Sequence, residues 1–225
     1  MLKKYKAFNL LYLLLFIVQL IAASFSFQIV TYIVTPLSLL SLLVFLTLKT
    51  KLKGRFHRRL FCGLLFTSIG ELLFLFHDHS STYGWLAIML AYFCYTRAFY
   101  LDFRSAQELD KKNARIAIAF FTVLGMGFYV FLRPYLGAIR IPAMAYIFLL
   151  SVMLMMSVFR NLRVNRESFT LIFSGALLFL ISDCLYAIDH YVQPFPMAGI
   201  LILAIAMAAK YFLVTGGVER KLLHQ

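Results

Sequence analysis

The chain has 225 residues, of which 63% are hydrophobic and only 14% are charged, and its mean hydropathy is +0.87. These values lie far outside the range of soluble globular domains, so the composition excludes that class and predicts an integral membrane protein. The formal net charge of +13 could indicate a nucleic-acid-binding protein, but the basic residues are not distributed as that class requires.

Eight apolar runs follow one another along the chain. Each run has about 17 to 21 residues, which is enough for a helix to cross roughly 30 Å of hydrocarbon. Because the runs are continuously apolar and do not alternate, they favour helices over the strands of a barrel. We therefore predict an all-α integral membrane protein with eight transmembrane helices, in which residues 1–225 form a single domain without a cofactor or a metal. The runs cover residues 7–26, 29–48, 60–76, 84–101, 116–133, 141–159, 169–188 and 197–215.

The basic residues gather at one end of these runs. They precede the first run and fill the connections between runs two and three, four and five, and six and seven, whereas the opposite side carries only Arg133 and Arg140. This positive-inside pattern predicts that both termini are cytoplasmic. It also predicts contact with anionic lipid head groups in the bilayer and no nucleic-acid partner. The compact chain, which has no Asn-x-Ser/Thr acceptor, favours a multi-pass protein of a bacterial inner (plasma) membrane.

Two acidic residues lie inside apolar runs and occupy matching positions. Glu71 in the third run and Asp183 in the seventh follow a glycine, Gly63 or Gly175, at the same spacing. Acids within membrane spans usually face the interior of the bundle or a wet cavity. Two neighbouring carboxyls favour one protonated and one ionised form, which suits general acid and general base catalysis. We predict a catalytic pair, and the alternative is a structural polar contact between two helices.

The two halves of the chain, residues 1–101 and 116–225, resemble each other. Arg97 follows Glu71 at nearly the same spacing as Lys210 follows Asp183, which indicates a possible parallel repeat of four helices plus four. With about 1.5 Å per residue, the acids lie roughly 9 Å below the outer ends of their helices and the bases roughly 20 Å below. Acids and bases are therefore expected in separate layers, with the bases either snorkelling or binding substrate.

Further candidates lie near the two acids. Tyr92 in the fourth run and Ser182, directly before Asp183, are candidate substrate-binding residues, although packing is the more common role of a tyrosine in a span. Asp189 is expected at the mouth of the cavity in contact with substrate. His and Asp also occur at 77–79 and 189–190, but they lack a recognised metal-ligand spacing and are expected to be solvated.

Four segments of the chain resemble the YhhN-like lysoplasmalogenase family of eight-span membrane proteins. They are residues 63–73 (GLLFTSIGELL), 142–146 (PAMAY), 175–183 (GALLFLISD) and 208–216 (AAKYFLVTG). The chain resembles a divergent member. Glu71 stands where the family usually has Asp, Thr35 where Lys is common, Tyr92 where His is common, and Lys210 where Gln is common.

The resemblance implies that the protein hydrolyses a lysophospholipid substrate. The reaction cleaves the vinyl-ether bond of lysoplasmalogens and gives a fatty aldehyde with glycerophosphoethanolamine or glycerophosphocholine. Glu71 and Asp183 would supply the acid–base chemistry, while Arg97 and Lys210 would attract the lipid phosphate. The alternatives are a proton-coupled small transporter and a non-catalytic lipid-binding membrane protein, and the departures at Thr35, Tyr92 and Lys210 favour the latter.

Overall fold

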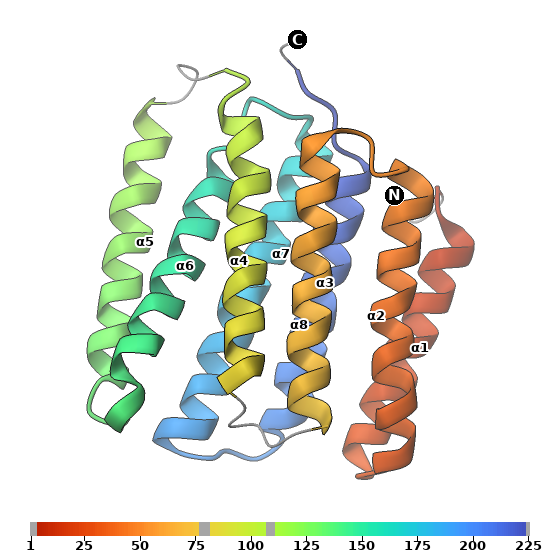
Figure 1. Cartoon of the computed structure of the whole chain (residues 1–225), viewed down its shortest axis with the longest axis vertical. Helices are drawn as coiled ribbons and strands as arrows, with labels where there is room; N and C mark the ends of the chain where they lie inside the picture. Colours follow the sequence, from red (N-terminus) through yellow and green to blue (C-terminus); the bar gives the residue numbers. More distant parts are fainter. Residues whose placement is uncertain (1–3, 77–81, 107–110, 224–225) are drawn as a thin grey trace.

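The chain folds into a bundle of long helices (Figure 1). The structure is a computed structural model that describes residues 4–76, 82–106 and 111–223. Within these ranges there is no named strand, which confirms the predicted all-helical class. The helices are α1 (Lys6–Ser24), α2 (Gln28–Thr50), α3 (Gly54–Phe76), α4 (Thr82–Phe103), α5 (Lys111–Leu132), α6 (Arg140–Val158), α7 (Arg166–Ala187) and α8 (Ala198–Val218). A 3₁₀ turn, Gly137–Ile139, precedes α6, and a π-helical turn, η2 (Ile188–Val192), continues α7.

Seven of these helices are long and apolar enough to cross a membrane, and α4 is the one that does not qualify. Four tyrosines together with Arg97 and Asp102 lower the hydropathy of α4. The fold is therefore that of a multi-pass membrane protein. The chain enters α1 and leaves α8 at the same end of the bundle (Figure 1), as the predicted topology requires. The assignment of that end to the cytoplasm stays a prediction.

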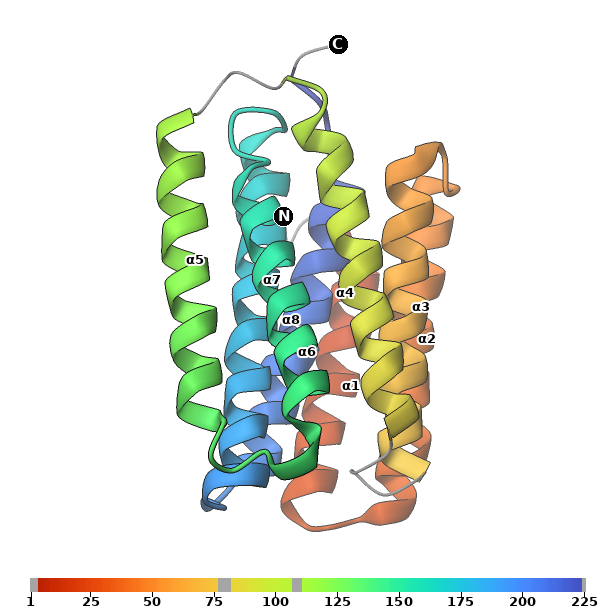
Figure 2. The ribbon, with the colours of Figure 1, turned by 60° about the vertical axis from the view of Figure 1, so that its left-hand side comes forward.

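The helices associate in pairs that correspond between the two halves of the chain. Helix α3 packs along α4 and α7 along α8, while α1 with α2 and α5 with α6 flank them (Figures 1 and 2). Across the halves, α4 packs against α6 and α8 against α2. Exchanging the halves converts each of these contacts into the other, which is the pattern that a parallel repeat would produce. The repeat itself stays a prediction.

The glycines before the two acids lie where helices approach closely. A Cβ atom on Gly175 would lie 2.8 Å from the carbonyl oxygen of Ala209 and 3.0 Å from the backbone nitrogen of Leu213, both in α8. Gly63 faces the ring of Tyr95 in α4 in the same way. Small residues at helix interfaces allow this kind of contact in membrane bundles. The matching glycines thus bring each acid-bearing helix close to its partner.

Replacing Gly175 with Ala is expected to destabilise the protein by about 1–3 kcal/mol, because the added methyl group meets backbone atoms that cannot rotate away. Thermal unfolding of the purified protein in detergent measures the effect. Gly127→Ala is the matched control, because a Cβ at this α5 position has no atom within 4 Å. Equal melting temperatures for the two variants would contradict the close approach of α7 and α8.

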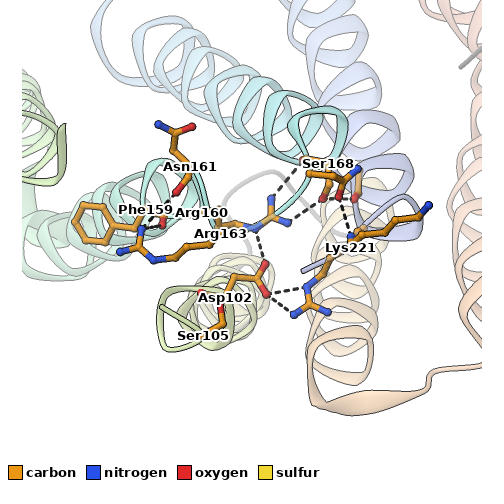
Figure 3. A network of polar contacts seen from close by, with 12 residues as sticks. Asp102, Ser105, Phe159, Arg160, Asn161, Arg163, Ser168 and Lys221 are labelled. Carbon is orange, nitrogen blue, oxygen red and sulfur yellow. Dashed lines mark hydrogen bonds and ion pairs between the residues drawn. The ribbon is translucent and has the colours of Figure 1, made fainter. Parts of the chain in front are cut away.

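A network of buried charges joins the helices at the end where the termini lie (Figure 3). Asp102 and Arg160 both have fully buried side chains, and Arg160 Nε donates to Asp102 Oδ2 at 2.7 Å. Arg220, which follows α8, donates from Nε to Asp102 Oδ1 at 2.7 Å. Arg160 also reaches Ser168 Oγ at 2.9 Å in α7. One carboxylate therefore connects α4, the end of α6, α7 and the segment after α8.

Burial has an electrostatic cost in this network. It lowers the pKa of the Arg160 guanidinium, and Asp102 opposes that shift. The rings of Phe56 and Phe99 lie 5.6 Å and 5.5 Å from the guanidinium carbon of Arg160, within the range of cation–π attraction. In the sequence, Arg160 is one of the basic residues between the sixth and seventh runs that indicate the cytoplasmic side. In the structure, it also joins helices through Asp102 and Ser168.

Candidate functional site

The helices enclose a cavity of about 600 Å³, a size typical of small-molecule sites. Every one of the eight helices contributes at least one residue to its wall. Glu71 and Asp183 both line this cavity, so the two acids predicted to form one site do face a common space. The two carboxyl groups nevertheless have different partners.

Asp183 is held by two tyrosines from two other helices. Tyr92 Oη in α4 donates to Asp183 Oδ2 at 2.5 Å, and Tyr146 Oη in α6 donates to the same oxygen at 2.8 Å. Tyr146 Oη also lies 3.3 Å from Tyr92 Oη. Tyr92 is only 1% exposed. Both phenols use Oδ2, so Asp183 Oδ1 is the oxygen that they leave available.

Glu71 forms an ion pair with Lys210. Lys210 Nζ in α8 lies 2.5 Å from both carboxylate oxygens of Glu71 in α3. The Lys210 side chain is 3% exposed and that of Glu71 is 24% exposed. The prediction of separate layers for acids and bases was wrong here, and Lys210 does not snorkel. The predicted layers were depths counted along the helix axis. The long Lys210 side chain extends away from that depth and reaches the Glu71 carboxylate.

Of the remaining predicted site residues, Ser182 and Asp189 lie at the cavity and Arg97 does not. Ser182 lines the cavity and donates to the carbonyl oxygen of Ile202 at 3.3 Å. Asp189 also lines the cavity and accepts a hydrogen bond from the backbone nitrogen of Phe195 at 3.2 Å. Arg97 is exposed and does not line the cavity, and its backbone carbonyl accepts a hydrogen bond from Arg59. The structure therefore does not bring Arg97 to the other candidates.

The histidine and aspartate positions have no geometry of a metal site in the described part of the chain. Residues 77–79 lie outside the described residues. His190 lines the cavity next to Asp189. Among the residues that the structure describes, no three His, Cys, Asp or Glu side chains gather closely enough to hold a metal ion.

Two polar contributions to the cavity were missed from the sequence. Tyr146 was not among the candidate site residues, although it lies in one of the segments that carry the family resemblance. Gln19, one of two amides within the first apolar run, was not considered. It lines the cavity, is 1% exposed and donates from Nε2 to Thr35 Oγ1 at 2.9 Å. Its Oε1 atom has no hydrogen-bond partner among the described residues. A polar residue inside an apolar run was the available signal.

The side of the cavity that α5 and α6 line is mainly apolar. Apart from Tyr146 and Ser151, its side chains are aliphatic or aromatic, and none of them carries a charge. Gly125 in α5 lies at a close approach to α6, since a Cβ there would meet Ser151 Oγ at 2.5 Å. This apolar side suits a hydrocarbon chain. The residues that form it are Phe121, Leu124, Phe128, Leu132, Ile147, Leu150 and Leu154.

Comparison with known proteins identifies a family for the chain. A family model described as the YhhN family matches residues 30–217. Neither the curated proteins nor the solved structures that were compared gave a match. The matched range contains both acids, both tyrosines that contact Asp183, and Lys210, whereas Gln19 precedes it.

Proposed function

The chain belongs to the YhhN family, and on that premise we propose that it is a membrane-embedded hydrolase of the vinyl-ether bond of lysoplasmalogens. The observation that carries the proposal is the pair of differently held carboxyls in one cavity. Asp183 has two phenol partners and Glu71 has an ammonium partner. Vinyl-ether hydrolysis needs a proton donor and a negative charge beside the cation that forms, and this pair offers both.

The reaction consumes one water molecule. A proton adds to the alkenyl carbon remote from the ether oxygen, and an oxocarbenium ion forms at the carbon that bears the oxygen. Water adds to this carbon and loses a proton. The resulting hemiacetal then collapses to a fatty aldehyde, while the glycerol oxygen takes up a proton. The products are the aldehyde and a glycerophospho-base, so atoms and charge balance.

We assign the proton donation to Asp183 through Oδ1, because both tyrosine hydrogen bonds go to Oδ2. Tyr92 and Tyr146 fix the rotamer of the carboxyl group, which orients the proton towards the substrate. Glu71 stabilises the oxocarbenium ion and accepts the proton of the attacking water. Lys210 holds Glu71 in place and keeps its charge balanced before the substrate binds.

The lining of the cavity supports the same substrate class. The apolar side formed by α5 and α6 would contact the alkenyl chain. The polar part, with Gln19, Thr35 and Ser182, would face the glycerol. The unpaired Oε1 of Gln19 would accept a hydrogen bond from a glycerol hydroxyl, since a buried polar atom without a partner costs free energy until it gains one.

Lipid binding without turnover is the second candidate. The Glu71–Lys210 ion pair favours it, because both Glu71 oxygens already have a partner at 2.5 Å. A carboxylate that never leaves its ammonium partner could not accept a proton from water. A proton-coupled transporter would use the same acids and would move protons without forming product.

Product analysis separates these functions. Purified protein in detergent would be given three lysophosphocholines that differ only in a vinyl-ether, a saturated ether or an ester linkage. We expect fatty aldehyde from the vinyl ether and no product from the other two. Binding of all three without product would support the lipid-binding candidate. Proton flux into liposomes without product would support the transporter.

A further inference from the structure

Aromatic side chains gather at the end of the cavity opposite the chain termini, where α7 continues into η2. Trp85 in α4 lies 5.9 Å from Tyr186 in α7 and 6.3 Å from Tyr191 in η2, measured between ring centroids. The planes of Tyr186 and Tyr191 are inclined to Trp85 by 60° and 51°. All three rings line the cavity and are only partly buried. They come from different elements and line one cavity at steep angles to Trp85, and Tyr186 also stacks on His190 with ring centroids 5.5 Å apart.

Aromatic cavity walls have a specific chemical preference. The face of an aromatic ring carries negative potential, and a cation within about 6 Å of the ring centroid is attracted to it. Tryptophan provides the strongest attraction. Rings that meet at steep angles, unlike a parallel stack, can direct their faces towards a common centre. The geometry of these three rings therefore suits a cation more than it suits a further apolar chain.

The charges of the cavity wall favour the same ligand. Asp189 lines the cavity beside Tyr191, and its Oδ1 accepts only a neutral backbone N–H. Among the described residues, Asp189 forms no ion pair, and the single lysine of the wall, Lys210, is paired with Glu71. Among the described residues, the Asp189 carboxylate therefore has no lysine or arginine partner, and His190 is its neighbour in the cavity wall. A positively charged group of a ligand would be such a partner.

The position along α7 connects this cluster with the reacting site. Asp189 lies about six residues beyond Asp183, which corresponds to roughly 9 Å at about 1.5 Å per residue. A glycerophosphate linker can bridge such a separation. A lipid whose vinyl ether lies at Asp183 and whose chain lies along the apolar side formed by α5 and α6 would place its head group between Asp183 and η2.

We propose that Trp85, Tyr186, Tyr191 and Asp189 bind the quaternary ammonium of a choline head group and select it over ethanolamine. The proposal rests on the proposed function for its choice of lipid. A trimethylammonium group has no N–H donor, so ring faces and one carboxylate can satisfy it completely. A primary ammonium carries three N–H donors, and removing these from water costs more when the walls are mostly aromatic.

The fluorescence of Trp85 reports the binding directly, because it is the only tryptophan of the chain. Purified protein would be titrated with phosphocholine, with phosphoethanolamine, and with 3,3-dimethylbutyl phosphate, in which a neutral tert-butyl group replaces the trimethylammonium. We expect phosphocholine to change the emission and to bind about tenfold more tightly than either of the others. Equal affinities for the three probes, or no change in emission, would overturn the proposal.

A ring variant and a matched control locate the effect. Tyr191→Leu is expected to weaken phosphocholine binding about tenfold. Tyr83→Leu should leave the affinity unchanged, because Tyr83 is 75% exposed in α4 and does not line the cavity. Unaltered binding by Tyr191→Leu would contradict the role of the ring.

The titration is independent of the hydrolase proposal, because none of the probes has a vinyl ether. Selective phosphocholine binding by a protein that forms no aldehyde would support the head-group site and reject the hydrolase. Aldehyde formation at equal kcat/KM from choline and ethanolamine lysoplasmalogens, together with non-selective probe binding, would reject the head-group site and keep the hydrolase.

Discussion

Replacing Asp183 with Asn is expected to lower kcat for vinyl-ether hydrolysis by about 10²- to 10⁴-fold, the contribution typical of a general acid. Asparagine keeps the size of the side chain and a carbonyl oxygen that can accept hydrogen bonds from Tyr92 and Tyr146. It cannot deliver a proton from Oδ1. The loss should therefore fall on kcat, with KM little changed, because the cavity that binds the lipid keeps its shape. Aldehyde release from a vinyl-ether lysolipid measures both constants.

A tyrosine variant provides the comparison for that result. Tyr146→Phe removes one of the two hydrogen bonds that fix Asp183 Oδ2 but leaves the carboxyl group in place. We expect a smaller loss of about tenfold, since Tyr92 still holds the same oxygen at 2.5 Å and one hydrogen bond contributes about 1 kcal/mol. Asp183→Asn with nearly full activity, in a protein of normal melting temperature, would remove Asp183 from the mechanism.

Replacing Asp102 with Ala is expected to destabilise the protein by about 3–5 kcal/mol, the usual cost of breaking a buried ion pair. The variant leaves the fully buried Arg160 guanidinium without its carboxylate and also releases Arg220. The contacts that hold α4 to the end of α6 and to the segment after α8 would be lost together. Thermal unfolding in detergent should show a large decrease in Tm.

The large destabilisation expected for Asp102→Ala arises because Asp102 is buried, so removal of an exposed carboxylate serves as the control. Glu167→Ala removes an exposed carboxylate from the first turn of α7 and is expected to change the free energy of unfolding by about 0.5 kcal/mol or less. Arg220→Met should lie between the two variants, because Arg220 is 14% exposed and Asp102 keeps Arg160 as its partner. Equal effects of Asp102→Ala and Glu167→Ala would show that the network does not stabilise the fold.

The sequence predicted the elements of the fold better than their contacts. Long apolar runs determine helices because backbone polar groups must be satisfied within the membrane, and eight helices follow at the predicted places. Helix α4 forms at its predicted place but does not qualify as an apolar span, because tyrosines, Arg97 and Asp102 interrupt its apolar residues. The resemblance to the YhhN family is confirmed by the match over residues 30–217.

The candidate site could be predicted only in part. A carboxyl group within an apolar run has few favourable places other than a polar interior, and for this reason Glu71 and Asp183 could both be expected at the cavity. The direction of a long side chain does not follow from its depth along a helix. Lys210 and Arg97 occupy similar positions in their helices, yet Lys210 reaches Glu71 and Arg97 is exposed.

Contacts between residues from distant parts of the chain could not be predicted from the sequence patterns. Tyr146 and Tyr92 meet at Asp183 from α6 and α4, and no spacing within one helix indicates this meeting. The aromatic cluster has the same origin, because Trp85 and Tyr191 are neighbours only after α4 and η2 have packed at one end of the bundle. Asp102 and Arg160 likewise read as parts of polar connections until their burial is known.

If the protein delivers a proton to carbon in a vinyl ether, hydrolysis in D₂O must leave deuterium at that carbon. The purified protein would act on a vinyl-ether lysolipid in D₂O, and the aldehyde would be trapped at once and weighed by mass spectrometry. The mechanism predicts one deuterium at the carbon next to the aldehyde group. The labelled aldehyde should form at the rate of the enzymatic reaction, and Asp183→Asn should form almost none. Aldehyde without deuterium at that carbon, or no aldehyde from folded protein, would contradict the account.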